Sequence, residues 1–153
     1  MTLSFRTGLA ALLCSFVLFF APAAQARDRD MTEDILYFTN KFRSSKGLKP
    51  LVLLDELSEQ AQAHSKNMAR KKVGFGHKGF DKRTAAIRSE LGWGSAFAEN
   101  VAYGHLDAEA VVNLWINSPG HRKNLLGDYT HIGIGIAEAR DGSLYFTQIF
   151  LAK

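Results

Sequence analysis

The sequence predicts an α+β fold in which helices cover an antiparallel sheet. Most of the chain before residue 120 shows apolar residues at helical spacing, whereas the last part holds two alternating segments, 131–139 and 143–152. An Arg-Asp-Gly sequence at 140–142 separates these segments, which is a strong hairpin signal. A third strand is expected at 97–104, where aromatic and β-branched residues alternate.

The helical segments follow from apolar periodicity and from end signals. Asp107 is a favourable N-cap for the fourth helix, and Pro119-Gly120 is expected to end it. A short extended piece follows Pro50. The expected helices are 32–45, 55–72, 81–91 and 107–118, followed by a short turn or helix at 121–127.

The N-terminus has the pattern of a secretory signal. Arg6 precedes an uncharged apolar stretch at 8–20, and Ala24-Gln25-Ala26 fits a small-x-small cleavage site. We therefore expect a signal peptide at 1–26, cleaved after Ala26, and one domain at 27–153, secreted or periplasmic.

The alternative interpretation of this segment is an uncleaved membrane anchor over 8–24, at the short end for a span. The single cysteine, Cys14, lies inside the predicted signal, and Leu13 before it is too large for a typical lipid-attachment site. We expect no stable membrane anchor after cleavage and no disulfide in the mature domain.

The charge of the chain argues against a nucleic-acid partner. The formal net charge is +4, and basic residues are scattered apart from Arg70-Lys71-Lys72. No basic stripe interleaved with aromatic residues is visible in the sequence. The basic run is interpreted as a solvated helix end.

Glu99 breaks the pattern of the 97–104 strand. It lies in phase with Phe97 and Val101, so its carboxylate is expected on an apolar face. Such a group needs a charged or hydrogen-bonding partner. The sequence offers two kinds of partner, an arginine such as Arg83 or Arg88 in a structural ion pair, or histidines.

Several other polar residues have both a structural and a functional interpretation. His77, in a loop rich in Gly and Phe, and His121, after Ser-Pro-Gly, are either solvated or form a metal or acid–base cluster with Glu99. Ser118 is either a structural residue at the C-terminal end of a helix or a nucleophile beside His121 and Glu99. His64, on an apolar helical stripe, is expected to be a core histidine that donates to a backbone carbonyl.

The two C-terminal strands carry further signals. Gly133 and Gly135 lie on one face, and such small residues allow a helix or a bound group to approach the sheet. Gln148 alternates onto the face of Phe146 and Phe150 and is a candidate for a buried hydrogen-bonding group or a polar residue at the sheet edge.

Several motifs in a fixed order resemble bacterial members of the CAP superfamily, which is named for cysteine-rich secretory proteins, antigen 5 and pathogenesis-related class 1 proteins. The resemblance covers about Thr32 to Leu151. The motifs are LDELSEQAQAHS, Gly76-His77, AENVAYG, WINSPGHRKNLL, IGIG and YFTQIF.

The resemblance implies a three-layer α-β-α sandwich with a central antiparallel sheet. It also implies a cleft that in eukaryotic members carries two histidines and two glutamates and holds a divalent metal, commonly zinc. By motif position, His77, Glu99 and, more loosely, His121 match three of these. Ser118 stands where the second glutamate is expected, which removes one charge from the site.

The sequence and the resemblance leave two functional hypotheses. The first is an exported binding module whose cleft, with His77, Glu99, Ser118 and His121, holds a lipid, a peptide or a cell-envelope ligand, with zinc bound by His77 and His121. The second is a metal-assisted or acid–base hydrolase in which Glu99, His121 and Ser118 are the candidate catalytic residues. In either case an ionised Glu99 is expected to raise the pKa of both histidines unless a cation takes the site.

Overall fold

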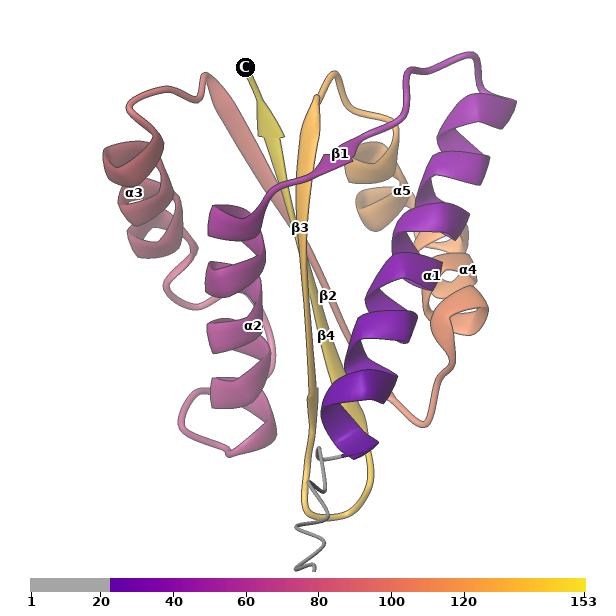
Figure 1. Ribbon diagram of the computed structural model, residues 1–153, viewed down its shortest axis with the longest axis vertical. Helices are drawn as coiled ribbons and strands as arrows, with labels where there is room; N and C mark the ends of the chain where they lie inside the picture. Colours follow the sequence, from indigo (N-terminus) through magenta and orange to yellow (C-terminus); the bar gives the residue numbers. More distant parts are fainter. Residues whose placement is uncertain (1–22) are drawn as a thin grey trace, which may run out of the picture.

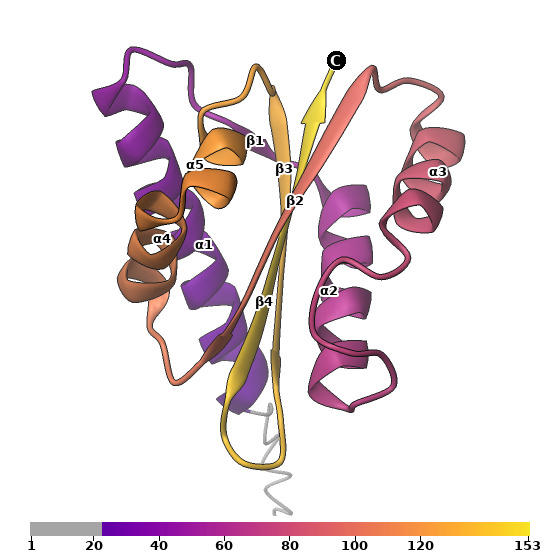
Figure 2. The same ribbon diagram turned by 180° about the vertical axis from the view of Figure 1, so that it is seen from behind.

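The computed structural model describes residues 23–153, with side chains from Met31 onward. The elements are α1 (Ala23–Ser45), β1 (Val52–Leu53), α2 (Asp55–Ala69), α3 (Phe80–Leu91), β2 (Ala96–Gly104), α4 (Ala108–Asn117), α5 (Pro119–Leu125), β3 (His131–Glu138) and β4 (Leu144–Ala152). The sheet lies in the middle, with α2 and α3 on one face and α1, α4 and α5 on the other (Figures 1 and 2). The predicted three-layer α-β-α sandwich is confirmed.

The strand order in the sheet is β1-β3-β4-β2. The three long strands are antiparallel, as expected, because β4 pairs with both β2 and β3 in that sense. The extended piece after Pro50 adds a two-residue strand, β1, which pairs in parallel with β3 through Val52 and His131. A piece this short shows no alternation, so its pairing is not visible in the sequence.

The first helix begins upstream of the expected Thr32, at Ala23, and so runs through the predicted cleavage position after Ala26. Residues 1–22 of the predicted signal lie outside the described residues, so the signal peptide stays a prediction. Within residues 23–153, no helix is long and apolar enough to cross a membrane.

The fourth and fifth helices meet at Ser118. The carboxylate of Asp107 accepts from Ala110 N at 2.8 Å, which confirms the predicted cap. Ser118 has extended backbone, and α5 begins directly after it at Pro119, where a helix tolerates proline because the first N–H needs no partner. Of the turn or helix expected at 121–127, the structure has the helix, and it begins earlier, at Pro119.

Helix α2 packs directly on β3 because that strand has glycines at the contact. A Cβ added at Gly133 would lie 2.2 Å from the carbonyl carbon of Leu57, and one at Gly135 would lie 2.2 Å from that of Ala61. No side chain fits at such distances. The predicted close approach of a helix to these glycines is confirmed.

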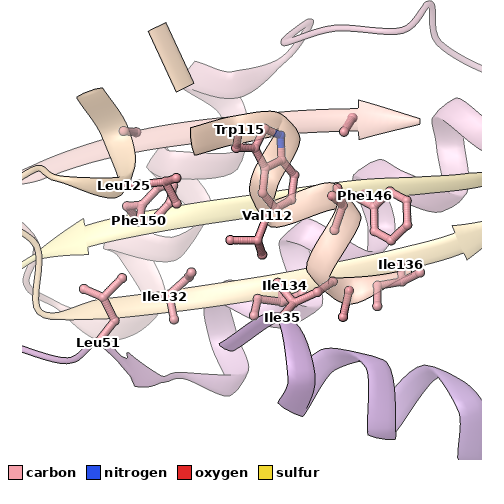
Figure 3. Packing of buried hydrophobic residues seen from close by; sticks show 14 residues of the cluster. Ile35, Leu51, Val112, Trp115, Leu125, Ile132, Ile134, Ile136, Phe146 and Phe150 are labelled. Atoms are coloured by element: carbon pink, nitrogen blue, oxygen red, sulfur yellow. The ribbon is translucent and has the colours of Figure 1, made fainter. Parts of the chain in front are cut away.

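The other face of the sheet carries the larger apolar core, shown in Figure 3. Trp115 of α4 is fully buried there, and its indole N–H donates to Val101 O of β2. The amide of Gln148 is also buried and donates to Thr39 Oγ1 of α1 at 3.0 Å, so Gln148 is a buried hydrogen-bonding group.

A buried arginine fixes the position of α5. Arg43, at the end of α1, is 2% exposed, and its guanidinium donates to four backbone carbonyls rather than to a carboxylate. Burial lowers the pKa of Arg43 from its ordinary value. The acceptors are the carbonyl oxygens of Lys49, Leu125, Gly127 and Tyr129.

Side chains occupy the open edges of the sheet. Asn40 of α1 bonds both backbone groups of Leu51, at the start of the β1 segment. Where β1 has ended, Gln62 of α2 bonds both backbone groups of Ile136 in β3 at 2.7 Å. On the opposite edge, Asn124 Nδ2 donates to Glu99 O of β2.

Candidate functional site

The carboxylate of Glu99 lies at the centre of the candidate site. Glu99 is in the middle of β2, on the face covered by α2 and α3, and its side chain is 1% exposed. Both kinds of partner that the sequence offered contact it. An arginine and a histidine reach its two oxygens from α3 and from the loop before that helix.

The arginine is Arg83. Its Nη2 lies 2.6 Å from Glu99 Oε2 and 2.8 Å from Oε1, and its Nε lies 3.0 Å from Oε2. The third nitrogen, Nη1, donates to Lys78 O. Arg88 is engaged elsewhere, because its Nε donates to Gly94 O and its guanidinium lies over the Phe97 ring. The buried carboxylate is thus compensated by charge-assisted hydrogen bonds from Arg83.

The histidine is His77. Its Nδ1 lies 3.0 Å from Glu99 Oε1, and its side chain is 52% exposed. A ring that donates from Nδ1 to a carboxylate keeps, when neutral, the lone pair on Nε2. Glu99 therefore fixes the tautomer of a solvent-accessible imidazole.

His64 holds the loop that carries His77. The ring of His64 is buried, and its Nε2 lies 2.7 Å from Gly76 O, so the prediction of a core histidine donating to a backbone carbonyl is confirmed. Burial lowers the pKa of His64, against the opposing effect of this hydrogen bond. A neutral ring still donates through Nε2–H, so the loop contact does not require protonation.

His121 approaches the same edge from the other helical layer. Its backbone carbonyl accepts from Asn100 Nδ2 of β2 at 3.3 Å. Its Nδ1 is buried and has no hydrogen-bond partner within residues 23–153. Burial lowers the pKa of His121, and the charge of His77 lowers it further, which places the two rings within electrostatic reach of each other. The expectation that Glu99 raises the pKa of both histidines is therefore wrong for His121, where desolvation dominates.

Asn124 ties α5, the helix that carries His121, to β2. Its Nδ2 donates to Glu99 O at 3.1 Å and to Asn100 Oδ1 at 2.9 Å. Asn100 is buried and also donates to Gln148 Oε1. Sequence reasoning missed Asn100 and Asn124, because amides in a strand and a short helix carry no periodic signal that marks them as buried.

Ser118 is half-buried between α4 and α5. Its carbonyl accepts from Arg122 N at 2.8 Å, but within the described part of the chain no hydrogen bond joins its hydroxyl to His121 or Glu99. The structure brings His77, Glu99 and His121 to the edge of β2 and adds Arg83. It does not link Ser118 to them.

The contacts leave one ring nitrogen of the site free on a solvent-accessible side chain. Both oxygens of Glu99 are already engaged by Arg83 and His77, so the carboxylate supports a ring rather than presenting a free acceptor. The atom available from the half-exposed ring is Nε2 of His77, whereas the unpartnered Nδ1 of His121 is buried. Among residues 23–153, no group of three or more His, Cys, Asp or Glu side chains is arranged to hold a metal ion.

Comparisons of the sequence and of the structure with known proteins agree on one family. The model described as CAP, cysteine-rich secretory protein family, matches residues 36–150. The uncharacterised protein YkwD of Bacillus subtilis (strain 168) is 37% identical over 127 residues, covering 78% of this chain and 46% of YkwD. The uncharacterised membrane protein YlbC of the same organism is 35% identical over 126 residues, covering 79% of this chain and 34% of YlbC. The chain spans less than half the length of these relatives.

Similar solved structures are also bacterial. One is an extracellular protein containing a SCP domain from Bacillus anthracis str. Ames, with TM-score 0.69 and 29% identity over 82% of this chain and 41% of that one. Another is a cysteine-rich secretory protein from Staphylococcus aureus subsp. aureus Mu50, with TM-score 0.67 and 27% identity over 83% and 40% of the two chains. An outer surface protein from Borrelia burgdorferi shares the fold, with TM-score 0.72 and 20% identity over 82% and 94%.

Proposed function

Because the chain belongs to the cysteine-rich secretory protein (CAP) family, and similar structures come from an extracellular and an outer-surface protein, we propose that it is a binding module that works outside the cytoplasm. The ligand contact is the edge of β2, where His77 and His121 lie within electrostatic reach of each other. The ligand classes that we propose are a lipid, a peptide or another component of the cell envelope.

The observation that carries this proposal is the double engagement of Glu99. Arg83 and His77 occupy both carboxylate oxygens, and the side chain is 1% exposed. A buried acid held in this way orients its neighbours and does not need to react. As a result, the exposed imidazole of His77 is held in one tautomer, with a free lone pair that can accept from a hydrogen-bond donor or bind a cation.

We further propose that the histidine pair holds a divalent metal, with zinc the first choice. A metal-ligating histidine usually donates its other ring N–H to a carboxylate, which is the relation between His77 and Glu99. His121 contributes a buried nitrogen that lacks a partner within the described residues, and its lowered pKa keeps the ring neutral at pH 7, as a metal ligand must be. Such an ion would supply a positive charge with open positions for an anionic or carbonyl group of the ligand.

A hydrolase receives less support from the same contacts. A general base must offer a free lone pair to a water, and the carboxylate oxygens of Glu99 are directed to Arg83 and His77. A serine nucleophile needs a hydrogen bond to its base, and none joins Ser118 to His121 within the described residues.

Metal content and zinc titration test the proposal. We expect the protein purified without its signal to bind zinc, and His77→Ala and His121→Ala each to weaken zinc binding by at least about tenfold. His105→Ala is the matched control, because His105 is exposed and, in the part of the chain that the structure describes, makes no hydrogen bond to this cluster. Unchanged zinc uptake in both site variants would remove the metal from the proposal.

Activity assays test the binding role itself. We expect no turnover of casein, ester or peptidoglycan substrates above a heat-treated control, with or without zinc. Turnover that disappears in Glu99→Gln while the variant keeps the wild-type unfolding midpoint would replace the binding module by the hydrolase.

A further inference from the structure

Three aromatic rings pack together where β2 ends, two of them exposed and the third, that of Tyr145, half-buried. Tyr103 and Tyr145 are directly opposite in the register of β2 and β4, and their rings stack at 5.4 Å with 20° between the planes. Phe75, from the loop after α2, packs edge-on against Tyr103 at 4.8 Å and against Tyr145 at 6.4 Å. We call these three residues the aromatic platform.

The platform is open to solvent. Phe75 is 52% exposed and Tyr103 is 55% exposed, although aromatic side chains of this size are usually covered. Tyr103 lies on the edge strand, so no further strand of the described sheet covers its outer side. Neither tyrosine hydroxyl makes a hydrogen bond to another residue within 31–153. Exposed, mutually packed aromatic residues of this kind mark interaction sites.

Exposed cations lie near the platform along the chain, because Phe75 follows residues 70–72 and Tyr145 follows the turn at 140–142. Arg70, Lys71 and Lys72 follow α2 directly and are exposed, and Arg140 is exposed in the turn between β3 and β4. Lys71 lies within electrostatic reach of Asp141, so the two segments are at the same end of the molecule. The end of α2 and the β3–β4 turn also lie together in both views (Figures 1 and 2). These two segments, 70–72 and 140–141, hold four cations and one carboxylate.

We propose that the aromatic platform binds an acidic glycan. The faces of aromatic rings are negatively polarised, and the C–H face of a pyranose ring is complementary to them. The tyrosine hydroxyls can bond sugar hydroxyls, and the nearby cations attract carboxylate or phosphate substituents. The two tyrosine rings are fixed by strand pairing and by stacking on each other, so a sugar would pack on an outer face. This surface uses neither His77 nor His121 and is additional to the proposed function.

Calorimetric titration with defined oligosaccharides tests the proposal. The acidic probe is a hexamer of galacturonate, and the neutral probe is a hexamer of N-acetylglucosamine. We expect saturable binding of the acidic hexamer that is weakened by at least about tenfold in Tyr103→Ala and in Phe75→Ala. Phe75 lies in a loop, so its variant reports on binding even if Tyr103→Ala perturbs β2. Tyr37→Ala is the matched control, since Tyr37 is 59% exposed on α1 and is expected to leave binding unchanged.

Charge variants and vesicles separate the competing explanations. Lys71→Gln combined with Lys72→Gln is expected to weaken the acidic hexamer more than the neutral one, and His77→Ala is expected to change neither. The proposal is overturned if neither hexamer binds saturably, or if Tyr103→Ala and Phe75→Ala bind like Tyr37→Ala. It is also overturned if only vesicles containing phosphatidylglycerol bind in a Tyr103-dependent manner, because the surface would then recognise a membrane.

Discussion

The guanidinium of Arg83 binds both carboxylate oxygens of Glu99, with its Nη2 2.6 Å from Oε2 and 2.8 Å from Oε1. The pair joins α3 to the edge strand of the sheet. It fixes the acid that orients His77, so this contact contributes both to the stability of the domain and to the geometry of the candidate site.

Replacing Arg83 by methionine is expected to destabilise the domain by about 3 kcal/mol, because a buried carboxylate loses its charged partner. Urea unfolding measures the change in the free energy of unfolding. Arg88→Met is the matched control on the same helix. It removes only a bond to Gly94 O and a contact with the Phe97 ring, so we expect a loss of about 1 kcal/mol. Equal losses for the two variants would contradict the assignment of Arg83 as the partner.

Replacing Arg43 by methionine is expected to cost about 3 kcal/mol or more, because several buried carbonyl groups lose their donor. The loss should be accompanied by weaker protection of α5 amides in hydrogen exchange, since Arg43 holds the carbonyl of Leu125. Arg122→Met, at an exposed position in α5, should stay within about 0.5 kcal/mol of the wild type. A small effect of Arg43→Met would show that water replaces the guanidinium.

Replacing Gly135 by alanine is expected to destabilise the domain by about 3 kcal/mol, because the new Cβ would lie 2.2 Å from the backbone of Ala61 and α2 would have to move. Thermal unfolding followed by circular dichroism measures the loss. Gly120→Ala is the control, because nothing lies within 4 Å of a Cβ at that position. Its expected effect is neutral or a gain of about 0.5 kcal/mol. A stable Gly135→Ala variant would mean that α2 does not lie on β3 as described.

Protonation of His64 is expected to make stability fall in mild acid. Its folded pKa is lowered by burial, so the unfolded chain binds more protons below the ordinary pKa of 6.5. The stabilising contribution is therefore complete above pH 6.5 and is lost as the pH falls below it. Urea midpoints at about pH 5 and about pH 7.5 measure this difference, which should shrink in His64→Gln. His105→Gln, at an exposed position, should keep the wild-type difference. An unchanged difference in His64→Gln would exclude His64 as its source.

Much of the fold could be predicted from local patterns. The stripe of Leu57, Ala61, His64 and Met68 is buried throughout α2, and the hairpin turn lies where Asp-Gly indicated. Periodicity is visible in the sequence because each turn of a helix and each alternate strand residue faces the same environment. The two-residue strand β1 is too short to produce such a signal.

The residues of the candidate site could be predicted from the sequence, but the hydrogen bonds and ion pairs that join them could not. Glu99 was out of place on an apolar strand face, and this alone indicated a charged partner. The choice between Arg83 and Arg88 depends on how α3 is rotated against the sheet, which a weakly amphipathic helix does not reveal. Arg43 carried no signal of burial, because a basic residue in the last turn of a helix is expected on electrostatic grounds wherever it points.

Side chains from the helices form hydrogen bonds with backbone groups along both edges of the sheet. Asn40 and Gln62 do so on one edge, and Asn124 and Trp115 do so on the other. An incoming chain would have to displace these side chains before it could extend the ladder. The edges of the sheet are therefore poorly suited to pairing with a second chain, which lowers the tendency of the domain to polymerise into fibrils.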